Sequence, residues 1–81
     1  MFNKNKIKIG GITYQVVEKE LEEMGKTDFV KSIIYLDNRL NKDQKSATLI
    51  HEILHCINNQ MNEKDVEFLA QALYGIYKDN F

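Results

Sequence analysis

The sequence has no proline, a single cysteine and no long apolar run. With Cys56 alone, no disulfide can form within the chain, so a bound metal is one remaining way to supplement a small core. No stretch is apolar enough for a signal peptide or a membrane span, and we expect a cytoplasmic protein that does not contact a membrane. Repeats and linker-like tracts are also missing, and residues 1–81 are expected to form one domain.

The chain also has no large excess of charge of either sign, because it contains 11 basic and 12 acidic residues and its net charge is −1. Such a chain has no strong field to attract nucleic acid, and we expect none to bind. Lys4, Lys6 and Lys8 alternate with other residues, as on the solvent face of an edge strand. Residues 18–28 are rich in charge and predict a solvated loop, with a helical turn around Leu21.

Apolar residues at alternating positions predict three strands. Residues 6–9 and 12–17 flank Gly10-Gly11, which predicts a hairpin with a two-residue turn, since glycine adopts the positive φ angles that this turn requires. Residues 32–37 are β-branched and aromatic and predict the third strand. Within it, residues 33–36 are expected to hold an extended peptide by edge addition.

Apolar residues three and four positions apart predict two helices. Asn41 is a good N-cap, with Gln44 placed to complete a capping box, so the first helix should run from about residue 42 to about residue 58. Residues 58–62 favour a turn, and the second helix follows. Its buried side is predicted to comprise Val66, Leu69, Ala70, Leu73, Ile76 and Tyr77. The fold class is therefore α+β, a small three-stranded antiparallel sheet packed on two antiparallel helices.

The pattern His51-Glu52-Ile53-Leu54-His55 lies within the first predicted helix. Residues four apart share a helix face, so His51 and His55 can direct two imidazoles at one metal ion. Glu52 is displaced by about 100° around the axis, which suits a general base better than a ligand. The spacing therefore predicts a zinc site with Glu52 as the catalytic base.

A catalytic zinc ion usually has three protein ligands and one bound water, so a third ligand is needed. Cys56 points roughly 100° away from His55, which makes it a poor partner. Glu63 borders the apolar side of the second helix just across the turn, and it is the preferred ligand. Glu67, one turn on, is the alternative, either as ligand or as hydrogen-bond acceptor for a ligating histidine. Asp65 points elsewhere on the helix.

Several segments resemble a known family. Residues 48–57, then residues 62–70 and Leu73-Tyr74, are similar to the gluzincin metallopeptidases, in particular to small phage-type proteins of the ImmA/IrrE kind. Residues 7–14 also resemble such proteins, so the likeness covers nearly the whole chain. It implies a minimal zincin-like core and a protein encoded by a phage or prophage that acts in the cytoplasm of a bacterial host.

The resemblance also implies roles for individual residues. His51 and His55 would bind zinc, Glu52 would be the catalytic acidic residue, and Glu63 would be the third ligand. The expected reaction is peptide-bond hydrolysis by a zinc-activated water, on a peptide or protein such as a phage repressor-type regulator. The alternatives are a zinc-stabilised protein-binding module with little or no proteolysis, and a purely structural zinc site, which has no need of Glu52.

Overall fold

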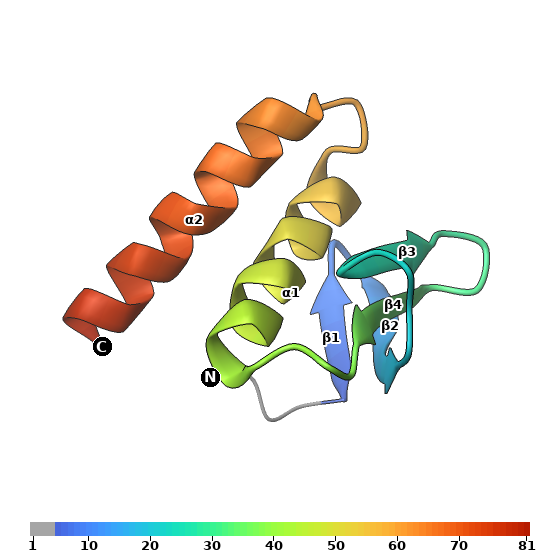
Figure 1. Ribbon diagram of the computed structural model, residues 1–81. Helices are drawn as coiled ribbons and strands as arrows, with labels where there is room; N and C mark the ends of the chain where they lie inside the picture. The colour runs from blue at the N-terminus through green and yellow to red at the C-terminus, as the bar shows by residue number, and fades with distance from the viewer. Residues whose placement is uncertain (1–4) are drawn as a thin grey trace.

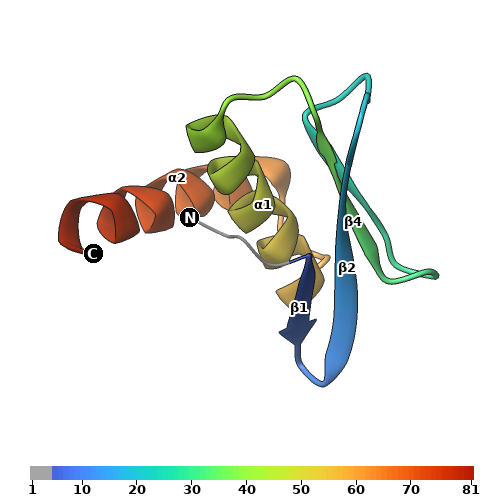
Figure 2. The ribbon, with the colours of Figure 1, turned by 90° about the horizontal axis from the view of Figure 1, so that it is seen from below.

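The computed structural model describes residues 5–81, which form a four-stranded sheet and two helices (Figure 1). The elements are β1 Lys6–Ile9, β2 Ile12–Lys19, β3 Gly25–Asp28, β4 Ile33–Asp37, α1 Lys42–Ile57 and α2 Glu63–Asn80. Both helices lie on the same side of the sheet, with α1 next to the strands and α2 packed on α1 (Figure 2). The predicted α+β class is confirmed.

The sheet is mixed, so the predicted three-stranded antiparallel sheet is wrong. Its order is β1-β2-β4-β3, with antiparallel pairs at both ends and a parallel pair, β2 with β4, in the middle. After β2 the chain first forms the outer strand β3 and then returns between the two as β4. Residues 33–36 therefore lie inside the sheet and cannot take a peptide by edge addition, also contrary to prediction.

The predicted hairpin is confirmed. Ile9 is paired with Ile12, and the intervening Gly10 and Gly11 have φ angles of 55° and 86°. Both values lie in the left-handed region that glycine enters without steric cost. β1 is an edge strand with Lys6 and Lys8 exposed, as predicted, while Lys4 lies outside the described residues.

Residues 18–28 form neither a simple loop nor a helical turn around Leu21. They complete β2, bend, and supply β3, and the Leu21 side chain is buried. The Arg39 guanidinium donates to the backbone carbonyl of Leu21 and to the carboxylate of Asp37 at the end of β4. These hydrogen bonds from Arg39 also hold the pKa of Asp37 below its usual value. The charged segment is thereby attached to the end of β4.

The core lies between the sheet and α1. Its buried residues are Tyr14, Ile34, Leu36 and Leu49. The capping box that starts α1 is confirmed, because the Asn41 side chain accepts from the Gln44 amide at 2.8 Å and the Gln44 side chain accepts from the Asn41 amide at 3.0 Å. This cap fixes where the helix begins and hence which residues face the sheet.

Helix α2 buries less of its apolar side than predicted. Val66 and Ala70 are buried against α1, but Leu73 is 45% exposed and Ile76 is 55% exposed. Because α2 packs on α1 rather than on the sheet, one neighbouring helix covers only part of a wide apolar stripe. Within residues 5–81, no helix is long and apolar enough to cross a membrane.

Candidate metal centre

The two histidines of the pattern lie one turn apart in the second half of α1. Their ring centroids are 5.0 Å apart, and both side chains are largely buried, with 22% of His51 and 18% of His55 exposed. The apolar residues of α1 hold the helix on the sheet, and this packing sets the direction in which both imidazoles point. The two imidazoles are therefore neighbours on the same face of α1.

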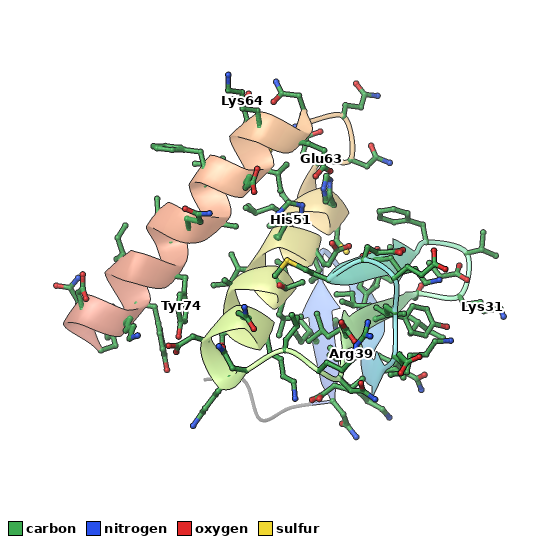
Figure 3. All side chains as sticks on the ribbon, in the orientation of Figure 1. Lys31, Arg39, His51, Glu63, Lys64 and Tyr74 are labelled. Carbon is green, nitrogen blue, oxygen red and sulfur yellow. The ribbon has the colours of Figure 1, made fainter. Side chains whose placement is uncertain are left out.

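Glu63 is the first residue of α2, where the Asn62 side chain caps the helix by accepting from the Asp65 amide at 2.8 Å. The Glu63 carboxylate contacts both imidazoles, with Oε1 2.6 Å from Nε2 of His55 and Oε2 3.2 Å from Nε2 of His51. In Figure 3 Glu63 and His51 point toward one another from facing helices, while Lys64 points away. The short turn after α1 makes this meeting possible.

These three side chains fit a zinc ion by donor type and by spacing. The ligand atoms of His51, His55 and Glu63 all lie within 4.8 Å of one another. Two ligands of a tetrahedral zinc ion, each about 2.0–2.1 Å from the metal, are roughly 3.4 Å apart, a separation within this limit. Among residues 5–81, neither Glu67 nor Cys56 joins this group.

Glu52 differs from the surface carboxylates of the chain because it is only 7% exposed. The Thr27 hydroxyl, on β3, donates to Oε1 of Glu52 at 2.7 Å. Sequence reasoning missed Thr27, since it lies in a charged segment with no strand signal. The hydrogen bond orients a carboxylate that adjoins the candidate ligands in sequence and is not itself part of their group.

Gly25, the first residue of β3, permits the close approach of β3 to α1. A Cβ atom at this position would lie 2.7 Å from Cγ2 of Thr48, 3.1 Å from the backbone oxygen of Tyr35 and 3.4 Å from Cγ of Glu52. Any larger residue would push β3 away from α1. Gly25 therefore maintains the contact that brings Thr27 to Glu52.

Cys56 is partly buried and packs against the core. Burial raises the pKa of its thiol, as does the nearby Glu52 carboxylate, whereas hydrogen bonds with Tyr14 and Thr27 act in the opposite direction. The position of Cys56 agrees with the prediction that it does not share the metal with His55.

Two cavities adjoin the histidines. One, of about 300 Å³, lies between the start of β3 and the two helices, and the other, of about 340 Å³, lies beside the later part of β3. His51 and Glu52 line both. A ligand in either cavity would therefore be next to the predicted metal ligand and base.

Comparisons with protein-family models, curated proteins and solved structures give no match. What the site can do is therefore argued from its own residues. Two imidazoles and a carboxylate that contacts both could hold a metal ion, and a separate buried carboxylate could serve as a base for hydrolysis.

Proposed function

We propose that the chain is a zinc-dependent metallopeptidase of the gluzincin type, related to the ImmA/IrrE family. The observation that carries this proposal is the position of Glu63, whose carboxylate contacts Nε2 of both His51 and His55 across the turn between the helices. The likeness of residues 48–57 and 62–70 to that family supports it.

The burial of Glu52 supports catalysis over a purely structural metal site. When bound, zinc lowers the pKa of its water and polarises a substrate carbonyl. Glu52, held by Thr27 beside the ligands, would accept the proton of the attacking water and deliver it to the leaving amine. A structural zinc site has no use for such a base.

The outer edge of β3 offers a place where an extended substrate could bind. Among residues 5–81, β3 pairs with β4 on one side only, and the cavities lined by His51 and Glu52 adjoin it. An extended peptide could pair with this edge and pass over the metal centre. The substrate would then be an unfolded segment or loop of a protein, such as a phage repressor-type regulator.

The second candidate function is a zinc-stabilised module that binds a protein partner without cleaving it. The exposed apolar side chains of α2, including Leu73 and Ile76, favour this alternative because such surfaces often contact other proteins. It shares the metal site with the first proposal and differs only in the use of Glu52.

Hydrolysis of a randomised octapeptide mixture, followed by mass spectrometry, tests the peptidase proposal. The zinc-loaded wild type is expected to cleave peptides, and Glu52→Gln to be slower by a factor of about 100 or more while holding the same amount of zinc. Cleavage by Glu52→Gln at the wild-type rate would contradict the assigned base. A wild type that holds zinc but cleaves nothing would favour the binding module.

A further inference from the structure

The two cavities follow one another along β3. Gly25, His51 and Glu52 line both of them. Met24, just before β3, lines only the cavity of about 300 Å³, and Thr27 lines only the other. The predicted metal ligand and base thus lie where the cavities meet. We call the first the Met24 cavity.

The direction of a peptide paired with the edge of β3 determines which part of it lies beside each cavity. Antiparallel pairing is slightly more stable than parallel pairing, so the peptide should run opposite to β3. It then passes Thr27 first, crosses the level of His51 and Glu52, and reaches Met24 last. The residue that follows the cleaved bond therefore lies next to the Met24 cavity.

The lining of the Met24 cavity favours a long side chain with a polar end. Met24, Ala47 and Ala70 provide apolar or small walls, while Glu67 and Gln71 of α2 add a carboxylate and an amide. A volume of about 300 Å³ is at the lower limit for ligand pockets, which leaves room for one side chain. Lysine and arginine combine an apolar stem with a charged end in this way.

The carboxylates of Glu67 and Glu63 differ in their charged partners. Glu63 contacts both histidines, whereas among residues 5–81 no salt bridge includes Glu67. Glu67 is exposed on α2, one turn after Glu63, and borders the Met24 cavity. Its negative charge is therefore available to a cation that enters this cavity.

We propose that the Met24 cavity selects a lysine or arginine residue on the carboxyl-terminal side of the cleaved bond, with Glu67 as the residue that determines this specificity. The assignment rests on the proposed peptidase function and names its substrate class. The aliphatic stem packs along Met24 and Ala70, and the charged end meets Glu67.

The test uses the zinc-loaded Glu52→Gln chain, which should bind peptides without cleaving them. Peptides retained from a randomised octapeptide mixture are sequenced to find the position at which particular residues are enriched. Calorimetry then compares the binding of two peptides that carry lysine or norleucine at that position. Lysine is expected to bind roughly fivefold more tightly, as for a partly exposed ion pair. Adding Glu67→Gln should remove this preference, and adding Asp65→Asn, which changes the net charge equally, should not.

Equal binding of the two peptides, a preference that survives Glu67→Gln, or no retained peptide at all would overturn the inference. So would loss of zinc from Glu67→Gln as complete as from Glu63→Ala, since Glu67 would then serve the metal. A lysine preference in the Glu52→Gln chain, together with a wild type that cleaves nothing, would support the cavity assignment and contradict the peptidase function.

Discussion

The carboxylates of this protein occupy very different environments, and the contrast between Glu52 and Glu63 carries the functional argument. Glu63 is 74% exposed by its side chain yet contacts two histidines, as a metal ligand at the protein surface would. Glu52 is buried and receives a hydrogen bond from Thr27. We propose that Glu63 holds a metal ion and that Glu52 moves a proton beside it.

Thr27→Val should test how far Glu52 depends on its hydrogen-bond donor. The substitution preserves shape but removes the hydroxyl, so a buried carboxylate loses a partner and the free energy of unfolding should fall by roughly 1–3 kcal/mol. Peptide hydrolysis should fall as well, while zinc content stays unchanged. Urea denaturation, the peptide assay and metal determination measure the three effects.

Thr27→Ser is the matched control, because it keeps the hydroxyl and should restore most of the hydrolysis. If Thr27→Val cleaved peptides as fast as the wild type, Thr27 would not position Glu52. Equal loss in the serine and valine variants would indicate that the hydroxyl alone is not sufficient and that the methyl group of Thr27 is needed as well.

Among the elements, α1 and the hairpin follow from local sequence. Asn41 and Gln44 form the predicted capping box, and Gly10-Gly11 forms the predicted turn, because each depends on residues only a few positions apart. β3 could not be predicted in this way. It is stabilised by pairing with β4 and by the room that Gly25 leaves for α1, and neither is visible in its four residues.

The same distinction applies to the candidate site. The spacing of His51, Glu52 and His55 and the nearby start of α2 were enough to favour Glu63, which the structure brings to both histidines. Thr27 could not be predicted as a partner of Glu52, since the two are 25 positions apart and meet only because β3 packs on α1. Local patterns identified the candidate ligands but not what supports them.

Gly25→Ala tests the contact between β3 and α1. The added Cβ would lie 2.7 Å from Cγ2 of Thr48, a stiff β-branched side chain on a helix, so either β3 or α1 must shift. We expect the free energy of unfolding to fall by about 1–3 kcal/mol, measured by urea denaturation. A stability equal to that of the wild type would show that the contact is not tight.

Gly75→Ala is the control for that substitution. Gly75 lies within α2, and a Cβ there has nothing within 4 Å. Because alanine favours the helix more than glycine does, the free energy of unfolding should rise by about 0.5–1 kcal/mol. The same chemical change should thus have opposite effects at the two positions.

For the whole molecule, stability depends on a thin layer of core between the sheet and α1, with α2 attached to the outside. At the other end of the helix pair from the candidate metal centre, Tyr74 and Lys78 of α2 both donate to the Asp43 carboxylate, so the two helices are joined near both ends. Asp37 and Arg39 attach the segment between β2 and β3 to the end of β4. Polar contacts at the periphery therefore supplement a small core.

The Asp37 contact should make stability depend on pH. The pKa of Asp37 is lower in the folded protein than its ordinary value of 3.8, chiefly because of its hydrogen bonds with Arg39. Its stabilising effect is therefore complete above about pH 4 and is lost as the pH falls through the lower folded value. Urea denaturation should show that the difference in free energy of unfolding between the wild type and Asp37→Asn becomes smaller as the pH falls from 7 to 3. A constant difference over this range would contradict the assignment.

Zinc content gives the most direct test of the central claim, that His51, His55 and Glu63 together bind a metal ion. Protein purified from zinc-supplemented cells would be measured by mass spectrometry for the wild type, Glu52→Gln, His55→Ala, Glu63→Ala and Glu67→Ala. We expect one zinc ion per chain in the wild type, in Glu52→Gln and in Glu67→Ala, and little in His55→Ala and Glu63→Ala. A wild type without zinc, or full zinc content in Glu63→Ala, would contradict the account.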